Sequence, residues 1–477
     1  MNKSMIRYLL SKLLLIEAVL LLVPVAIAVY YRESSQVFTA LFSTIGILVL
    51  LGGSGSLQKP KNQRIYAKEG VLIVALCWIL WSFFGGLPFV FSGQIPSLID
   101  AFFEISSGFT TTGASILNDV SVLSRSLLFW RSFTHLIGGM GVLVFALAIM
   151  DNAKNSHLEV MKAEVPGPVF GKVVSKLKNT AQILYLLYLA LFSLFVIIYY
   201  LAGIPLYDSF VIAMGTAGTG GFTVYNDGIA HYGSSLITYL VSIGVLVFGV
   251  NFNLYYYLML RRIKAFFGDE ELRAYLVIVL VSTGLISLNT LYPGFSKSFE
   301  MTFFQVSNII TTTGFGYGDI TNWPLFSQFI LLFLMAIGGS AGSTAGGLKI
   351  IRGLILSKIA KNQILSILSP HRVLTLHVNQ TVIDKDTQHK ILKYFVIYAM
   401  ILLALIFIVS LDSNDFLVVT SAVFSCFNNI GPILGTTSSF SIFSPISKIL
   451  LSFAMIAGRL EIYPILLLFM KRTWSKR

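Results

Sequence analysis

Long apolar runs separated by short polar segments dominate the 477-residue chain. Examples are the runs at residues 9–30, 71–91, 182–201, 274–291 and 394–411. Each is close to the roughly 18–20 apolar residues that cross a bilayer as a helix. The first run is too long for a cleaved signal sequence and contains Glu17, so we expect it to be a true span. The pattern predicts an all-α polytopic membrane protein.

A set of runs recurs four times after an N-terminal pair of spans at residues 9–30 and 37–57. In each copy a long run is followed by a short run, then by a segment rich in glycine with threonine or asparagine, then by a second long run. The copies comprise residues 71–91, 97–107 and 127–150; 182–201, 206–214 and 235–260; 274–291, 299–310 and 325 onward; and 394–411, 416–427 and 446–470. Four copies in one order predict internal repeats. We expect the N-terminal pair at residues 1–69 and the pore repeats at 70–155, 156–268, 269–365 and 366–477.

The short runs cannot cross the membrane. About 12 residues at 1.5 Å each give a helix of roughly 18 Å, about half of a 30 Å hydrocarbon core. The chain must then return in a non-helical form, which is tolerated at that depth only beside protein or a water-filled cavity. Four such re-entrant loops around one axis predict a pseudo-fourfold pore.

The segments after the short runs have the composition of an ion filter. They read GFTTTGAS, GTAGTGGFT, TTTGFGYGD and NNIGPILG, with Gly113, Gly221, Gly314 and Gly431 at equivalent points. Glycine permits left-handed backbone, so that carbonyl oxygens can turn toward one axis. Rings of such oxygens replace the hydration shell of potassium in channels. The predicted K+ filter residues are Thr111, Thr112, Gly113, Thr219, Gly220, Gly221, Thr312, Thr313, Gly314, Asn429, Ile430 and Gly431. For any one segment, a helix break or a packing glycine is the alternative.

Composition and charge agree with the membrane assignment. The chain is 56% hydrophobic and 12% charged, with a mean hydropathy of +0.81, whereas soluble domains carry roughly 25% charged residues. The net charge of +13 would suggest nucleic acid in a soluble protein. Here the bases cluster in segments separated by even numbers of spans, so we expect no nucleic-acid partner. The positive-inside rule then predicts cytoplasmic termini.

The opposite loops are expected to be acidic and to attract cations. Their acids are Glu33, Asp100, Glu104, Asp119, Asp208, Asp227, Glu300, Asp319, Asp412 and Asp415. Their bases are Arg32, Arg125, Arg131, Lys297 and Lys448. The two cysteines, Cys77 and Cys426, lie in apolar runs and predict neither a disulfide nor a metal site.

The returning run of the third repeat contains GGSAGSTAGG, residues 338–347. Each interior glycine costs a helix up to about 1 kcal/mol, so we expect a non-helical loop near mid-membrane that lines a cavity. Below a filter such a loop could act as a gate; a static kink or a close helix crossing is the alternative. The predicted gate residues are Gly338, Gly339, Ser340, Gly342, Ser343, Thr344, Gly346, Gly347 and Arg459. Lys349, just after the loop, either holds the gate or extends to the cytoplasmic surface, and we favour the second.

Arg459 belongs to this set because it is a charge inside an apolar run. Such a charge is costly unless it is paired or faces water. Glu461 lies two residues away, so the two side chains do not share a helix face. We expect Arg459 to face the pore or the glycine loop as a barrier to cations. A structural ion pair with another helix is the alternative.

The filter motifs, together with RSFTHLIGGMG (residues 131–141), AIGGSAGSTAGGLKIIR (336–352) and GRLEIYP (458–464), resemble those of the Trk/Ktr/HKT superfamily of potassium transporters. The two extra N-terminal spans are similar to those of the TrkH/TrkG branch. The resemblance implies a subunit that moves K+ along its electrochemical gradient through a bacterial inner membrane, with one filter glycine per repeat and an arginine beneath the filter beside an obstructing loop. It also implies a homodimer in membrane lipid, joined to a cytoplasmic ring of TrkA-like nucleotide-binding subunits, and no organic cofactor. Ile433 departs from the family pattern, in which a smaller residue is expected.

Two other functions compete with the pore. A secondary transporter coupled to sodium or protons would use a closed midplane site made by discontinuous helices. It would need acids near that site, whereas the acids here flank the outer mouth. A membrane enzyme would need clustered His, Asp, Glu or Cys at membrane depth, which the sequence does not show, so we expect no enzyme. The cytoplasmic segments 151–180 and 349–393 either contact a regulatory partner or lie against lipid headgroups.

Overall fold

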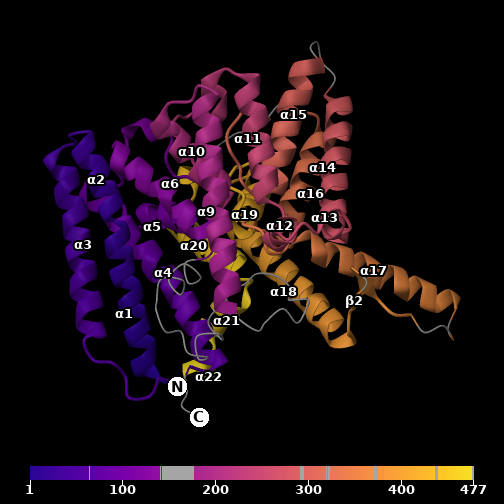
Figure 1. Cartoon of the computed structure of the whole chain (residues 1–477), viewed down its shortest axis with the longest axis horizontal. Coiled ribbons are helices and arrows are strands. Elements are labelled where there is room, and N and C mark those ends of the chain that lie inside the picture. Colours follow the sequence, from indigo (N-terminus) through magenta and orange to yellow (C-terminus); the bar gives the residue numbers. More distant parts are fainter. Residues whose placement is uncertain are drawn as a thin grey trace.

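The computed structural model describes the chain except residues 64, 140, 142–176, 291–294, 319, 321–322, 370, 372–373, 380, 436–438 and 475–477. The described part is a bundle of helices with one antiparallel hairpin, formed by β1 (His377–Val378) and β2 (Thr381–Val382) (Figure 1). The predicted all-α membrane fold is therefore confirmed. Asp319 and most of the predicted cytoplasmic segment 151–180 lie outside the described residues.

Membrane-spanning helices occur where the long runs predict them. Within the described ranges, six helices are long and apolar enough to cross a membrane, or seven if one bent pair counts as a span. The N-terminal pair of spans consists of α1 (Lys3–Leu20) continued by α2 (Leu22–Tyr30), and of α3 (Ser35–Ser56). These helices form one edge of the molecule (Figure 1), and large apolar side chains on them are exposed, as helices that meet lipid require.

The first two pore repeats follow in the predicted order of long, short and returning helix. The first contains α4 (Ala67–Phe91), α5 (Leu98–Phe109) and α6 (Arg125–Gly139). The second contains α9 (Leu177–Leu201), α10 (Leu206–Gly218), α11 (Ser235–Phe248) and α12 (Phe252–Met259). The short elements of this half are η1 (Val120–Val122), η3 (Gly228–Tyr232) and α13 (Ile263–Phe267).

The other two repeats have the same order. The third contains α14 (Glu270–Asn289), α15 (Phe295–Ile310), α16 (Leu325–Ile337) and α17 (Ile350–Leu368). The fourth contains α18 (Lys385–Val409), α19 (Phe416–Asn428), η4 (Phe440–Ile442), α20 (Pro445–Arg459), α21 (Tyr463–Phe469) and the terminal turn α22 (Lys471–Trp474). The predicted residue boundaries between the repeats remain predictions.

The short helices arrange the four repeats in a circle. Each packs against the returning helix of the preceding repeat: α10 on α6, α15 on α11 and α19 on α16. The circle closes because α5 of the first repeat packs on α20 of the fourth. The first turns of α5 and α19 are fixed locally, since Ser97 and Asp415 accept hydrogen bonds from backbone N–H groups at the starts of these helices.

Among the described residues, three returning runs are interrupted where the sequence predicts continuous runs. In the run at 127–150, α6 ends at Gly139 and Gly141 is non-helical with a φ angle of 87°, whereas residues 142–150 lie outside the described residues. The run at residues 235–260 bends by 90° between α11 and α12. Gly249 lies at this bend against Tyr275 and Thr311, where a β-carbon would not fit. The run at 446–470 breaks between α20 and α21, where Glu461 and Ile462 have positive φ angles of 59° and 69°. Hydropathy alone predicts the length of a run but not a bend within it.

Both chain termini lie at the same end of the molecule (Figure 1). The Lys68 Nζ donates a hydrogen bond of 2.8 Å to the carbonyl oxygen of Arg472, near the C-terminus. The backbone N–H of Asn2 lies 3.1 Å from Glu69 Oε1. The basic segments at the two termini and before α4 therefore share one face, as even numbers of crossings require.

Candidate ion filter and gate

The four short helices end in the same backbone turn. Two residues before each filter glycine, a non-glycine residue has the left-handed conformation, which is uncommon for such residues. These are Thr111, Thr219, Thr312 and Asn429, with φ angles of 55°, 54°, 55° and 58°. The residue that follows each one donates its N–H to the carbonyl five positions earlier: Thr112 to Ser107, Gly220 to Gly215 and Thr313 to Asn308 at 2.8 Å, and Ile430 to Ser425 at 2.9 Å. The sequence repeat is thus a repeat in backbone geometry.

The filter glycines close a ring. A β-carbon at each would overlap a backbone carbonyl oxygen of the next repeat. The glycine and carbonyl pairs are Gly113 with Gly220, Gly221 with Thr313, Gly314 with Ile430, and Gly431 with Thr112. The structure therefore brings the predicted filter residues together, and a side chain at any of the four glycine positions would push two repeats apart.

Threonine hydroxyls pair beside this ring. The Oγ1 atoms of Thr110 and Thr112 lie 2.7 Å apart, and those of Thr311 and Thr313 lie 2.8 Å apart. All four side chains are buried. These hydroxyl pairs fix the first and third segments in the same manner.

Pore-helix side chains hold the outer part of three segments, each at the third residue after the filter glycine. Glu104 Oε2 accepts from the Ile116 N–H at 2.9 Å. Gln305 Nε2 donates to the Tyr317 carbonyl at 2.8 Å. Ser421 Oγ accepts from the Leu434 N–H at 2.9 Å and donates to its carbonyl at 3.0 Å.

The departure at Ile433 is accommodated by packing. The Ile433 side chain is buried in the largest apolar cluster. The neighbouring Leu434 is bonded to the pore helix through Ser421, as described above. The fourth segment is therefore held like the first and third despite its larger residue.

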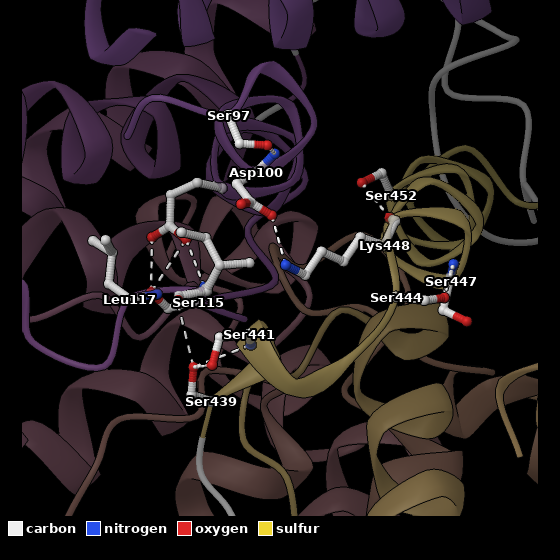
Figure 2. A network of polar contacts seen from close by, with 12 residues as sticks. Ser97, Asp100, Ser115, Leu117, Ser439, Ser441, Ser444, Ser447, Lys448 and Ser452 are labelled. Atoms are coloured by element: carbon white, nitrogen blue, oxygen red, sulfur yellow. Dashed lines mark hydrogen bonds and ion pairs between the residues drawn. The ribbon is translucent and has the colours of Figure 1, made fainter. Parts of the chain in front are cut away.

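The junction between the fourth and first repeats carries further polar contacts. Asn429 Nδ2 donates to Thr112 Oγ1 at 2.9 Å. Figure 2 shows Lys448 of α20 pointing at Asp100 of α5, and the Nζ to Oδ1 distance is 2.7 Å. Lys448 is largely buried in a helix, so its prediction as an outer-loop charge is wrong.

Glu104 and Arg131 were also expected in outer loops, and this expectation is wrong too. They lie in α5 and α6, with their side chains 0% and 3% exposed, and form an ion pair of 2.5 Å. A charged residue near the end of an apolar run looks like a loop residue in the sequence. Its burial depends on an oppositely charged partner that lies elsewhere in the chain.

Asp119 remains an exposed acid beyond the first filter segment. Asn226, beyond the second, donates to Asp119 Oδ1 at 2.7 Å. This hydrogen bond is the main cause that lowers the Asp119 pKa below its ordinary value. The carboxylate is therefore negative at neutral pH. Asp208 and Glu300, which were also expected in outer loops, are instead buried in α10 and α15, so for them the expectation is wrong.

The predicted glycine loop, residues 338–347, is non-helical between α16 and α17. Gly338 has φ 72° and ψ −165°, a combination accessible essentially to glycine alone. The Gly346 N–H donates to the Thr312 side chain at 2.7 Å, and a β-carbon on Gly346 would overlap the Asn428 carbonyl. The loop thus lies directly against the third and fourth filter segments.

The same loop reaches the second repeat. The Ser340 N–H donates to the Gly249 carbonyl at 3.1 Å, and Thr344 Oγ1 donates to the Phe248 carbonyl at 3.2 Å. These carbonyls belong to the end of α11, where the returning helix breaks. The loop therefore uses backbone acceptors that the bend leaves available.

Arg459 connects the loop to the first repeat. Its Nη1 donates to the Thr344 carbonyl at 2.6 Å, and its Nη2 donates to the Gly138 and Gly139 carbonyls at 2.5 and 2.6 Å. Gly138 and Gly139 end α6, where the helix dipole is negative. Arg459 lies beside the loop as predicted, and the loop with Arg459 contacts all four repeats.

Charged side chains hold the other side of the loop. Lys349 is only 3% exposed and its Nζ donates to the Ala345 carbonyl, so its expected extension to the surface is wrong. Its backbone has a positive φ of 76° immediately before α17 begins. Glu271 Oε1 accepts from the N–H groups of Ala341 and Ile351 at 2.7 and 3.1 Å. The role of Glu271 could not be predicted from the sequence, because interaction with the helix dipole already accounts for an acid in a first helical turn.

Comparisons with known proteins agree with this architecture. Residues 34–476 match the family model for TrkH, a cation transport protein. The chain is 32% identical over 461 residues to the Trk system potassium uptake protein TrkG of Escherichia coli (strain K12), with 95% of each chain covered. It is 32% identical over 470 residues to TrkH of Salmonella typhimurium (strain LT2), with 96% of each covered. The crystal structure of the potassium transporter TrkH from Vibrio parahaemolyticus matches with a TM-score of 0.90 and 29% identity over 100% of both chains. The chain belongs to the TrkH family of cation transport proteins.

Proposed function

We propose that this chain is the pore-forming subunit of a potassium uptake system and that K+ crosses through the ring of Gly113, Gly221, Gly314 and Gly431. The closed contact of each glycine with a carbonyl of the next repeat supports this most directly. Neutral backbone oxygens around one axis can replace the hydration shell of a monovalent cation. The relatives described above are named as potassium uptake proteins, which supports the choice of ion.

The glycine loop and Arg459 are proposed as the gate. The loop contacts filter segments from the inner side and is bonded to all four repeats with Arg459. A guanidinium beneath a cation filter repels cations, and the loop would have to move for ions to pass. This differs from a static kink, which would need no bonds to the other repeats.

The distribution of charge and the names of the relatives suggest the orientation of the pore in the membrane and its partners. The termini share one face with basic segments, so we place that face in the cytoplasm of a bacterium and the helices in its inner membrane. A homodimer joined to a cytoplasmic ring of TrkA-like nucleotide-binding subunits is our proposed assembly, since the relatives are named as members of a Trk system. K+ is the cargo, and we propose no organic cofactor and no enzymatic activity.

Cation flux into liposomes tests the proposal. Purified protein alone is reconstituted, a voltage is imposed, and uptake of potassium, rubidium, sodium and lithium is compared. Uptake of potassium and rubidium well above sodium, driven by voltage alone, is the expected result. Uptake that requires a sodium or proton gradient would instead support the coupled transporter.

A gate variant distinguishes a closed pore from an inactive protein. Arg459→Ala is reconstituted in parallel, because loss of its bonds to the loop should open the pore. Selective flux in Arg459→Ala but not in the unmodified protein would support a closed, gated pore. Absence of potassium flux in both, with protein that elutes as a single folded species, would contradict the proposal.

A further inference from the structure

The motif RSFTHLIGGMG places a charged and aromatic cluster between the first two filter segments. Arg131 of α6 reaches back to the first pore helix, where its Nε lies 2.5 Å from Glu104 Oε1. Both side chains are buried, as given above. His135 lies four residues later on the same helix face, and its Nδ1 is 2.8 Å from the carbonyl of Gly108 in the first pore helix.

Glu104 connects Arg131 to the backbone just beyond Gly113, the first filter glycine. Its Oε1 accepts from Ser115 Oγ at 2.9 Å, and its Oε2 accepts from the Ile116 N–H at 2.9 Å. Two filter-side groups and one guanidinium thus share a single carboxylate. The position of the carboxylate fixes where the first segment leaves the ring.

Arg131 also reaches the second segment. Its guanidinium carbon lies 3.3 Å from the centre of the Phe222 ring, and Phe222 directly follows Gly221. The His135 ring lies 4.2 Å from the same phenylalanine, and a β-carbon on Gly220 would overlap the imidazole. A cation held against an aromatic face is attracted by the ring quadrupole, so Arg131 couples the two neighbouring segments.

The buried pair suits a position beside a cation pathway. Either charge alone would be uncompensated in the protein interior, whereas the pair is neutral as a whole. The pair cannot exchange partners with water, so it holds a fixed geometry. A filter can distinguish K+ from Na+ by the size of its cavity or by the field of its carbonyl groups. Both properties depend on how firmly the filter backbone is held.

We propose that Arg131 is a positioning residue that sets potassium over sodium selectivity by holding the first filter segment through Glu104 and the second through Phe222. It does not bind the ion itself. The inference rests on the proposed filter, since it assigns a role beside that ring. Loosening this junction lets two of the four segments move, which weakens discrimination without removing the pore.

The test is the reversal potential of purified, reconstituted variants under opposing potassium and sodium gradients. Arg131→Gln is expected to lower the K+/Na+ permeability ratio about tenfold, equivalent to about 1.4 kcal/mol. Phe222→Leu keeps the ion pair and the apolar volume, and a drop of about threefold is expected. The ratio does not depend on the amount of folded protein, so an effect on folding yield alone would not change it.

Two further variants complete the test: one avoids a folding defect, and the other is a matched control. The double variant Glu104→Gln/Arg131→Gln buries no unpaired charge and is expected to fold with a lowered ratio. Arg352→Gln removes an arginine of similar chemistry on the gate side, paired with Glu461 at 2.5 Å and 4.1 Å from the Tyr394 ring. We expect Arg352→Gln to leave the permeability ratio unchanged.

The outcomes separate this inference from the proposed filter. An unchanged ratio in Phe222→Leu and in the double variant, while Gly113→Ser lowers it, would overturn the role of Arg131 alone. An unchanged ratio in Gly113→Ser as well would count against the filter itself. A drop of the same size in Arg352→Gln would show a general loss of structure and would also overturn the inference.

Discussion

The filter and the glycine loop lie against each other but are held by different forces. The filter consists of four segments with one backbone geometry, and neighbouring backbones contact each other where side chains are absent. Among the described residues the loop occurs in the third repeat only, and charged side chains from other helices bond to its backbone: Glu271 to Ala341 and Arg459 to Thr344. A ring fixed by steric contact has no alternative arrangement of similar energy, because interiors are close-packed.

A loop fixed by a few polar bonds behaves differently. A hydrogen bond to a charged group contributes about 1.5–3 kcal/mol, so breaking one shifts an equilibrium by roughly tenfold to a hundredfold. The bonds around the loop can break one at a time without opening the apolar clusters that surround it. The comparison predicts that filter variants change which ion passes, whereas loop variants change how much passes.

Gly113→Ser should give the largest effect. The added side chain would overlap the Gly220 carbonyl, and overpacking of this kind costs about 1–3 kcal/mol. We expect the K+/Na+ permeability ratio to fall by roughly tenfold to a hundredfold, measured as a reversal potential in mixed salts. Gly203→Ser, at a positive-φ glycine with open space around it, is the control. An unchanged potential in Gly113→Ser would count against the ring as filter.

Arg459→Ala should raise potassium flux about tenfold and leave the permeability ratio unchanged, since bonds to three carbonyls are lost. Flux into liposomes under a fixed voltage measures this. A deletion within residues 338–347 should act in the same direction. Arg459→Lys keeps the charge but lacks the planar fork that bonds several carbonyls, and so it should be intermediate. If the alanine variant and the deletion both abolish folded protein, a structural role explains the loop better than a gate.

Glu271→Gln should raise flux about threefold, because the amide oxygen can still accept hydrogen bonds from Ala341 and Ile351 but without the negative charge. The matched control is Glu270→Gln, one residue earlier, which pairs with Lys358 in a partly exposed position. Surface pairs of this kind contribute about 0–1 kcal/mol, so little change in flux is expected there. Equal flux in Glu271→Gln and Glu270→Gln would show that Glu271 does not hold the loop closed.

Thr312→Val should give the smallest effect and test the contact between the two regions. The change removes the hydroxyl that accepts the Gly346 N–H at 2.7 Å while keeping the shape of the side chain. A neutral hydrogen bond contributes about 0.5–1.5 kcal/mol, so we expect flux to rise about twofold to threefold. A large loss of selectivity with no gain in flux would show that Thr312 acts in the filter rather than on the loop.

The sequence allowed prediction of those parts of the site that depend on local backbone. Glycine at fixed spacing predicted the unusual backbone at Gly113, and the glycines at 338–347 predicted the break after α16, whereas the left-handed conformation of Thr111 was not predicted. Both predictions rest on conformations that few residues can adopt. The structure places these residues together, as the internal repeat requires.

Contacts between distant charges could not be predicted in the same way. Arg131 with Glu104, and Glu271 with Ala341 of the glycine loop, join residues far apart in the chain. Each residue alone looks like a solvated charge at the end of a span. The bend at Gly249 was missed because its cause, the approach of Tyr275 and Thr311, is also tertiary.

The closed ring of glycines has a consequence for how such a protein can change over generations. In a pore of four identical chains, one codon change alters all four quarters at once. Here each quarter is encoded by a separate part of one gene. A mutation therefore changes one quarter of the pore and leaves the other three unchanged. Asn429 can therefore stand where the other quarters have threonine, and a single quarter can carry the glycine loop, a division of labour that identical chains cannot inherit.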